Sequence, residues 1–587
     1  MIKRLLQEVK QYKKSSLLAP LFMVGEVTLE LMLPFLMSFI IDKGVDAGNM
    51  SEILKYGSLM IVCAFASLIC GTLSGWHAAY ASSGFVKNIR EAMFQSIQKF
   101  SFSNIDKFST SGLVTRMTTD ASRVQNAYQM VIRMCVRSPL MLIVAFCMTV
   151  YINAKMALIF IGAGLFLSAV LVLISTKALP TFRATFRKYD DLNGSVQENV
   201  TNIRVVKSFV KEKEEIEKFR NASGNLKKMF LKAENILVFN NPVMQLTMYF
   251  CMILLSWMGA KLVVASQLST GELMSLFTYT MNILSSLMML SMIFVMLTMS
   301  MASAQRIVEI LEEKPDLTNP EHPVMEVKDG SIEFEHVSFG YAKGEDKQVL
   351  TDINLKISSG ETIGILGPTG SSKSTLMSMI PRLYDVDNGV VRVGGIDVKE
   401  YDLKTLRDAV AMVLQKNVLF SGSIKENLRW GDEHATDEEM VEACRLACAD
   451  EFIQGFPDKY DTHIEQGGTN VSGGQKQRLC IARALLKKPK VLILDDSTSA
   501  VDTATDAKIR KAFAEEIPDT TKLIIAQRVS SVQHADRIIV MDHGMVTDFG
   551  THEELLEKSE IYRDVYESQT GGSGDFDENK EENGGDM

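Results

Sequence analysis

The chain has 587 residues, 47% of which are hydrophobic, and a formal net charge of −9. No basic stripe with interleaved aromatic residues accompanies this negative charge, which argues against nucleic acid as a partner. The eight cysteines form no zinc-type pair of CxxC motifs and imply no disulfide framework. The hydrophobic residues lie mostly in the first half, so a membrane part followed by a soluble part is expected.

Six apolar segments occupy the first half of the chain. They are preceded by a basic amphipathic stretch, Met1 to Lys14, which we interpret as an interfacial helix and not as a signal peptide. The segments are approximately Leu17–Ile41, Ile53–Tyr80, Ser138–Ile152, Met156–Leu179, Pro242–Val264 and Leu273–Met299. Each is near or above the roughly 20 residues that a bilayer crossing needs, except the third, which would borrow residues from its polar side. Residues 1–311 are therefore expected to form a transmembrane domain with six spans.

The distribution of lysine and arginine predicts the orientation of the six spans in the membrane. The connections after the first, third and fifth segments carry one lysine each, whereas those near Ser83–Arg133 and Pro180–Asn241 are long and basic. By the positive-inside rule, both termini and these two long connections lie on the cytoplasmic side of a cell membrane. The helical periodicity of the long connections predicts that the membrane helices continue well into the cytoplasm.

Two groups of residues in the spans are candidates for lining a substrate cavity. Glu26 and Glu30 lie four residues apart on one face of the first span, where carboxylates are costly, so they could meet cationic compounds or only bond neighbouring helices. Several of the 34 methionines fall in the last span, among them Met292 and Met296. Methionine suits surfaces that accept varied apolar ligands, although lipid-facing or packing use explains it equally well.

Residues 312–330 are rich in proline and polar residues and are interpreted as a linker. In residues 331–569, short β-rich runs alternate with charged helical stretches, which predicts a soluble α/β domain. Residues 570–587 are glycine-rich and acidic and are expected to be a disordered tail.

The soluble domain contains a phosphate-binding loop between the apolar run Thr362–Leu366 and a helical segment. Its small residues let backbone N–H groups close around phosphates, Lys373 would reach the β- and γ-phosphates, and the Ser374 hydroxyl would ligate Mg²⁺. Ser372 stands where the motif has glycine and brings a side chain into a crowded turn. ATP and Mg²⁺ are the predicted cofactors. The loop residues expected to contact ATP are Gly367, Pro368, Thr369, Gly370, Ser371, Ser372, Lys373, Ser374 and Thr375.

Further segments follow the phosphate loop in the order expected for a nucleotide-binding site. Val491–Asp495 reads as a strand whose terminal aspartate would hold Mg²⁺, and Ser472–Gln475 opens a helix with small residues that suit phosphate contact. Tyr341 could stack on adenine, and Gln415 could touch both metal and water. Taken singly, such residues are more often a core aromatic and a loop polar residue, but their order around the other motifs favours the functional interpretation.

With these motifs, nearly the whole chain resembles a half-transporter of the ATP-binding cassette (ABC) exporter family. The resemblance rests on the phosphate loop, on Asp495 ending the Walker B strand, on Ser499-Ala-Val-Asp502 as the D-loop, and on the family signature of Val471, Ser472, Gly473, Gly474 and Gln475. It implies an all-α membrane domain of six helices with long cytoplasmic extensions, fused to a soluble α/β P-loop ATPase domain. It also implies a dimer in which each ATP lies between the phosphate loop of one subunit and the signature of the other. Gly112–Arg116 and Gln197–Asn199 resemble the two coupling helices, the second of which would dock on the partner's ATPase domain.

Three residues depart from the family pattern, and all belong to one ATP site. The catalytic glutamate is replaced by Asp496, whose carboxylate would fall about 1.5 Å short of the attacking water. The switch histidine is replaced by Gln527, which can donate a hydrogen bond but cannot carry a positive charge. The third departure is Ser372. Because the signature is intact, the pattern resembles the degenerate-site subunit of a heterodimeric exporter whose partner is a second half-transporter with an intact catalytic glutamate and switch histidine.

The sequence therefore predicts one subunit of an ATP-driven exporter that moves drugs or other amphiphiles out of the cytoplasm by alternating access, in contact with membrane lipid. Its own site would hold ATP and hydrolyse it poorly, while Ser472–Gln475 would complete the partner's site. A peptide or lipid exporter with the same engine stays open as an alternative. So does an ATP-gated membrane protein that does not pump.

Overall fold

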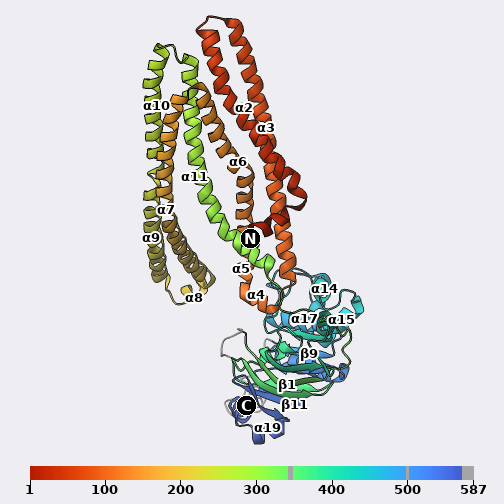
Figure 1. Ribbon diagram of the computed structural model, residues 1–587. Coiled ribbons are helices and arrows are strands. Elements are labelled where there is room, and N and C mark those ends of the chain that lie inside the picture. Colours follow the sequence, from red (N-terminus) through yellow and green to blue (C-terminus); the bar gives the residue numbers. More distant parts are fainter. Residues whose placement is uncertain (342–347, 497–500, 571–587) are drawn as a thin grey trace. The chain divides into compact units, whose positions relative to one another are not determined.

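The computed structural model describes residues 1–341, 348–496 and 501–570 (Figure 1). The chain divides into two compact units, the first formed by Met1–Gln98 with Phe108–Glu313, and the second by Lys99–Lys107 with the residues from Lys314 onward. Of the predicted acidic tail, residues 570–587, only Thr570 is described, as the last residue of a helix; residues 571–587 lie outside the described residues, as do Ser499 and Ala500 of the predicted D-loop.

The first unit is entirely helical. Its helices are, in chain order, α1 (Ile2–Leu6), η1 (Gln7–Tyr12), α2 (Lys13–Phe39), η2 (Ile40–Val45), α3 (Met50–Gln98), α5 (Thr110–Thr115), η3 (Arg116–Asp120), α6 (Ala121–Ile152), α7 (Ala154–Thr201), α8 (Ile203–Ser208), α9 (Glu212–Leu237), α10 (Asn240–Val264) and α11 (Thr270–Glu312). Within this unit α2 lies beside α3, and α7 lies beside α9 and α10 (Figure 1). The expected interfacial helix is divided into α1 and η1 after Leu6, and η1 is kinked at Lys10, which has a φ of 39°.

Six helical segments of this unit are long and apolar enough to cross a membrane, which confirms the predicted number of spans. They are Ile2–Val45, Met50–Gln98, Thr110–Ile152, Ala154–Ala178, Glu212–Val264 and Thr270–Glu312. Helices α3, α7 and α11 contain 49, 48 and 43 residues. At 1.5 Å per residue each is longer than about 60 Å, twice the roughly 30 Å of a hydrocarbon core, so these helices continue beyond the membrane as predicted.

The core of the first unit is built on α2. Met23, Val27 and Leu31 recur every four residues along it, which places them on one face, and all three are buried. They belong to a cluster with Tyr279 of α11 and Leu255 of α10. The buried Tyr279 hydroxyl donates a hydrogen bond to the Leu31 carbonyl at 2.9 Å, so its polar end is satisfied within the helix packing.

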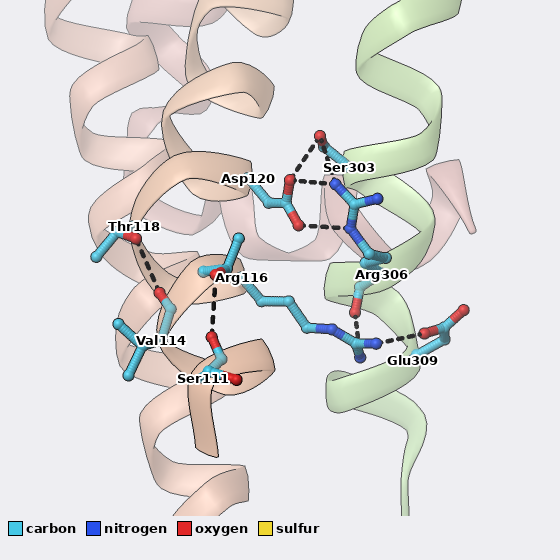
Figure 2. A network of polar contacts seen from close by, with 9 residues as sticks. Ser111, Val114, Arg116, Thr118, Asp120, Ser303, Arg306 and Glu309 are labelled. Carbon is cyan, nitrogen blue, oxygen red and sulfur yellow. Dashed lines mark hydrogen bonds and ion pairs between the residues drawn. The ribbon is translucent and has the colours of Figure 1, made fainter. Parts of the chain in front are cut away.

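A polar network joins the start of the third span to α11 (Figure 2). The carboxylate of Asp120, which is fully buried, accepts hydrogen bonds from Arg306 Nε at 2.7 Å and from Ser303 Oγ at 2.8 Å. Arg116 donates to the Arg306 carbonyl and pairs with Glu309 at 3.1 Å. This segment, which contains the predicted first coupling helix Gly112–Arg116, is therefore bound within the first unit.

A different segment packs within the second unit. Helix α4 (Phe102–Phe108) follows α3, and residues Lys99–Lys107 cluster with the second unit. Ser103 Oγ donates to Asp316 at 2.8 Å, and Asn104 Nδ2 donates to the Lys314 carbonyl at 3.2 Å. These contacts with the second unit are made by α4 and not by Gly112–Arg116, whose assignment as a coupling helix stays a prediction.

The second unit is α/β, as predicted. A six-stranded sheet has the order β12 (Met545–Gly550), β11 (Arg537–Asp542), β3 (Thr362–Leu366), β10 (Thr521–Ile525), β9 (Val491–Asp495) and β6 (Val410–Val413), and all its pairs are parallel except β11 with β12. A four-stranded antiparallel sheet has the order β2 (Leu350–Ile357), β1 (Ile332–Phe339), β4 (Asn388–Val393) and β5 (Ile396–Asp397), and a small pair joins β7 (Gly422–Ser423) to β8 (His463–Ile464).

The remaining helices of the second unit cover these sheets. They are α12 (Lys373–Met379), α13 (Leu403–Ala409), α14 (Ile424–Leu428), α15 (Asp437–Leu446), α16 (Asp450–Gln454), η4 (Lys459–Asp461), α17 (Gly473–Leu485), α18 (Thr503–Glu516), η5 (Val529–Ser531), α19 (His552–Lys558) and α20 (Glu560–Thr570). Strands β9 and β10 are buried along their whole length. The apolar runs Val491–Leu494 of β9 and Leu523–Ile525 of β10 are typical of central parallel strands that are covered on both faces.

Candidate active site

The candidate site lies at the carboxyl ends of β3, β10 and β9. Ile365 of β3 pairs with Ile525 of β10, which in turn pairs with Asp495 of β9, so the three strands end level with one another. The residues that follow each strand are therefore brought to the same edge of the sheet. They are the phosphate loop after β3, Asp496 after β9 and Gln527 after β10.

The phosphate loop closes around the ammonium group of Lys373. Its Nζ donates to the carbonyls of Gly367 and Pro368, both at 2.8 Å, and to Ser371 Oγ at 3.3 Å. Burial lowers the pKa of this lysine, while the nearby carboxylates of Asp495 and Asp496 act to raise it. The loop thus holds a cation at the first turn of α12, where phosphate oxygens are favoured.

Ser372 occupies a backbone conformation that favours glycine. It immediately precedes α12 and has φ 72° and ψ 23°, a left-handed conformation that glycine adopts freely. A residue with a Cβ is disfavoured there by roughly 1–2 kcal/mol. The loop therefore keeps the backbone path of a glycine-containing motif although it carries a serine.

Ser374 and Asp495 form the pair expected to hold Mg²⁺. The Ser374 hydroxyl donates to Asp495 Oδ1 at 2.9 Å. Burial raises the pKa of Asp495, and the nearby carboxylate of Asp496 raises it further. The hydrogen bond from Ser374 and the positive charge of Lys373 act to lower this pKa, but the net shift is upward. Among the described residues no group of three or more His, Cys, Asp or Glu side chains could hold a metal ion by itself. A hydroxyl and one carboxylate fit a magnesium ion that takes its other ligands from phosphate and water.

Asp496, Gln527 and Gln415 are brought together as predicted. Asp496 Oδ2 accepts a hydrogen bond from Gln527 Nε2 at 2.9 Å and a longer one from Gln415 Nε2 at 3.5 Å. Asp496 itself has a positive φ of 48°. The carboxylate at the position of the general base is thus held by two neutral amides.

Tyr341, predicted to stack on adenine, lies at the edge of the loop. Its side chain is 54% exposed, and its hydroxyl lies 2.9 Å from the Thr375 hydroxyl, so these two predicted residues share a hydrogen bond. The ring of Tyr341 also packs edge-to-face on Tyr384 with 5.4 Å between centroids. An aromatic ring at this place is available for stacking.

The predicted signature residues lie at the start of α17. Ser472 caps α17 through a capping box, in which its hydroxyl accepts from the Gln475 N–H at 3.3 Å and its own N–H donates to Gln475 Oε1 at 2.9 Å. Gly473 and Gly474 form the first turn of this helix. Within the described part of the chain, no hydrogen bond joins Ser472–Gln475 to the phosphate loop.

Comparison with known proteins decides the family. The chain matches the family described as "ABC transporter transmembrane region" over residues 17–302 and the family described as "ABC transporter" over residues 350–499. It is 35% identical to the uncharacterized ABC transporter ATP-binding protein YfiB of Bacillus subtilis, over 98% of this chain and 99% of that protein. The chain belongs to the ABC transporter family. It is a half-transporter with one transmembrane and one ATP-binding domain, and an ATP-hydrolysing transport enzyme.

Two further similarities extend this result. The chain is 30% identical to the ATP-dependent lipid A-core flippase of Desulfotalea psychrophila, over 97% of this chain and 99% of that protein. A solved structure of a bacterial Atm1-family ABC exporter with ATP bound has the same fold, with a TM-score of 0.79, 23% identity, and coverage of 97% of this chain and 99% of that one. Family membership implies that this ABC transporter is a multi-pass membrane protein that binds ATP, usually with Mg²⁺.

Two residues of the ATPase domain were missed by sequence reasoning. Tyr384 packs against Tyr341 and donates a hydrogen bond to Asp106 of α4 at 2.7 Å. Burial raises the pKa of the Tyr384 hydroxyl, and Asp106 raises it further. Gln569 of α20 holds the segment after β10, since its amide donates to the Gln527 carbonyl at 2.9 Å and accepts from the Val529 N–H at 2.8 Å. No motif indicated either residue.

The predicted D-loop aspartate has a local structural role. Asp502 caps α18, where its side chain accepts a hydrogen bond from the Thr505 N–H at 2.9 Å. This hydrogen bond lowers the pKa of the Asp502 carboxyl. The contact orients the residue that follows the undescribed part of the loop.

The predicted substrate residues of the membrane domain differ in their surroundings. Glu26 and Glu30 both pair with Arg137 of α6, at 2.5 and 2.7 Å, so their charges are not both free for a cationic compound. Met292 and Met296 are 63% and 40% exposed on α11. Their role in substrate contact stays a prediction.

Proposed function

We propose that this ABC transporter is one subunit of a heterodimeric exporter that moves amphiphilic compounds out of the cytoplasm by alternating access. In this proposal its own ATP site holds ATP and hydrolyses it slowly. Its signature residues Ser472–Gln475 complete the active site of a partner half-transporter that has a catalytic glutamate and a switch histidine. Both termini and the ATPase domain would be cytoplasmic, in line with the distribution of lysine and arginine.

The observation that carries the proposal is the cluster of Asp496, Gln527 and Gln415. A general base must reach the proton of the attacking water, and Asp496 is one methylene shorter than the family's glutamate. Its Oδ2 is already engaged by the Gln527 amide at 2.9 Å. Gln527 can donate a hydrogen bond, but unlike histidine it cannot gain or release a proton and cannot carry a positive charge. This arrangement suits binding of ATP better than its hydrolysis.

The state of the other motifs supports a selective loss. Lys373, Ser374 and Asp495 keep the contacts that phosphate and Mg²⁺ binding need. Ser472 and Gln475 keep an intact capping box at the start of α17. Only the residues that would act on the attacking water and the γ-phosphate, together with the strained Ser372, depart from the pattern. A chain that binds ATP and serves its partner's site would have these features.

An amphiphilic substrate is supported by the relatives. A relative that matches almost the full length of this chain is a lipid A-core flippase by name, which makes lipid-like compounds a reasonable class. Accumulation of an amphiphilic dye in reconstituted vesicles upon addition of ATP would test for pumping. If ATP instead opened a passive leak of the dye in both directions, the chain would be a gated channel and the exporter proposal would fail.

The degenerate site is tested by restoring the family residues. We expect the purified chain alone to hydrolyse ATP slowly, and the triple variant Ser372→Gly, Asp496→Glu, Gln527→His to be at least tenfold faster, because a positioned general base contributes about 10²–10⁴-fold. Adding Ser472→Arg to the triple variant should abolish the gain, since the signature would act across the dimer. That control separates the restored site from a contaminating ATPase.

The opposite result would overturn the proposal. If the unmodified chain alone hydrolysed ATP as fast as the triple variant and lost this activity on Asp496→Asn, Asp496 would be a competent base. The chain would then be an ordinary exporter subunit that can work as a homodimer.

A further inference from the structure

An open cavity of about 750 Å³ lies within the transmembrane domain between α2, α3 and α6. Four charged side chains line it: Glu26 and Glu30 from α2, and Arg133 and Arg137 from α6. Formally they cancel, with two negative and two positive charges. Charged groups inside a span are costly and are therefore candidates for function.

These four groups are not fully paired with one another. Arg137 binds both glutamates, through Nη1 to Glu26 Oε1 at 2.5 Å and through Nη2 to Glu30 Oε2 at 2.7 Å. The second oxygen of Glu26, Oε2, and Nε of Arg133 are buried, and neither has a hydrogen-bond partner in the described part of the chain. A buried polar atom without a partner is destabilising, and more so when it is charged. The cavity is therefore lined by one carboxylate oxygen and one guanidinium nitrogen that lack a hydrogen-bond partner among the described residues.

The spacing of these two groups follows from glycines on α3. A Cβ at Gly71 would come 3.0–3.2 Å from the Glu26 carboxylate, and a Cβ at Gly75 would come 3.7–3.9 Å from the Arg133 guanidinium. Gly71 and Gly75 are four residues apart on one helix, a rise of about 6 Å. The two unused groups, of opposite charge, thus lie about one helical turn apart along α3. The absence of side chains at these glycines leaves the space next to both groups open.

We propose that this cavity binds the zwitterionic headgroup of an amphiphile, with its phosphate or carboxylate at Arg133 and its ammonium group at Glu26 Oε2. A compound with only a cationic group would leave Arg133 unpaired, and one with only an anionic group would leave Glu26 Oε2 unpaired. The apolar chain would lie along Leu68 and Trp76, which also line the cavity and are 63% and 59% exposed. The inference rests on the proposed function only for the claim that the bound amphiphile is transported.

Binding can be measured without transport through Trp76, one of three tryptophans in the chain. The full-length protein in a non-ionic maltoside detergent would be titrated with short-chain phosphatidylethanolamine, phosphatidylglycerol or an alkyltrimethylammonium salt while tryptophan fluorescence is recorded. We expect a saturable change with the zwitterionic lipid, and affinities at least tenfold weaker for the other two, since each of these lacks one charge-assisted hydrogen bond. Trp76→Phe should remove the signal. Titration with free phosphoethanolamine separates the two sources of the headgroup, because a lipid-specific site should bind it far more weakly.

Variants on α6 and α3 provide matched controls. Arg133→Gln should weaken binding of the zwitterionic lipid at least tenfold. It should leave the melting temperature of the protein unchanged, because Arg133 makes no ion pair within the described residues. Arg137→Gln, in contrast, should lower the melting temperature by leaving two glutamates unpaired. Gly71→Ala should weaken binding by displacing the Glu26 carboxylate, whereas Gly57→Ala on the same helix, with nothing within 4 Å, should have no effect.

Equal affinity for the three charge types, or unchanged binding in Arg133→Gln, would overturn the proposal. Binding with this charge dependence but without ATP-driven movement of the lipid would leave the site standing and refute the exporter function. ATP-driven movement of amphiphiles that is insensitive to Arg133→Gln and Gly71→Ala would support the exporter function and refute the proposed headgroup site.

Discussion

The ion pair between Asp120 and Arg306 should contribute strongly to the stability of the transmembrane domain, and Asp120→Asn tests this. The Asp120 side chain is 1% exposed and that of Arg306 is 41% exposed. Removing one partner of a fully buried pair costs about 3–5 kcal/mol. Because Arg306 can regain part of its hydration, and because asparagine keeps one oxygen for Ser303, we expect a loss of about 2–3 kcal/mol.

A second ion pair between the same elements provides the control. Arg116 of η3 and Glu309 of α11 are paired at 3.1 Å, with side chains 14% and 45% exposed. Exposed pairs contribute only about 0.2–1 kcal/mol, so Glu309→Gln should have a small effect. Thermal unfolding of both variants in the same detergent would compare them directly. If Glu309→Gln lowered the melting temperature as much as Asp120→Asn, the argument from burial would be refuted.

Three further predictions concern the ATPase domain. Ser372→Gly should raise its stability by up to about 1 kcal/mol in thermal unfolding by relieving the left-handed strain, whereas Ser372→Ala should give no gain. The raised pKa of Asp495 predicts that Mg²⁺-dependent ATP binding weakens as the pH falls, because a protonated carboxyl cannot ligate the metal. This loss should begin at a higher pH than for an ordinary aspartate. Titrations with ATP and Mg²⁺ at several pH values should show this pH dependence, and Asp495→Asn should remove it. Tyr384→Phe keeps the ring but loses the bond to Asp106, so hydrogen exchange of α4 should rise about fivefold while ATP affinity stays unchanged; unchanged exchange would contradict this.

The ATP site could be predicted from sequence because its parts are local. A phosphate loop needs a strand, small residues and a helix start in succession, and residues 362–379 supply them in that order. Asp496 and Gln527 could be placed in the same site because each follows a buried parallel strand, and such strands end at one edge of a sheet. Even their contact at 2.9 Å follows from this topology.

Contacts between distant segments could not be predicted. Glu26 and Glu30 were placed on one face of a helix by their spacing, but nothing in that spacing indicates that Arg137, more than 100 residues later, pairs with both. Tyr384 and Asp106 are 278 residues apart and belong to no motif. The segment 99–107 was assigned to the membrane part because it lies between spans, and only packing shows that it clusters with the ATPase domain.

The contacts of Tyr384 bear on how a site with poor hydrolysis could still serve transport. Tyr341, at the expected adenine position, packs on Tyr384, and Tyr384 is bonded to Asp106 of α4. The contacts of Tyr341 with Tyr384 and of Tyr384 with Asp106 do not involve Asp496 or Gln527, so this path does not run through the residues proposed to act on the attacking water. Helix α4 is continuous in sequence with α3, which is a membrane span. In the proposed degenerate-site subunit, ATP bound at Tyr341 would act on α4 without hydrolysis, and such a chain would still have a reason to keep its ATP site.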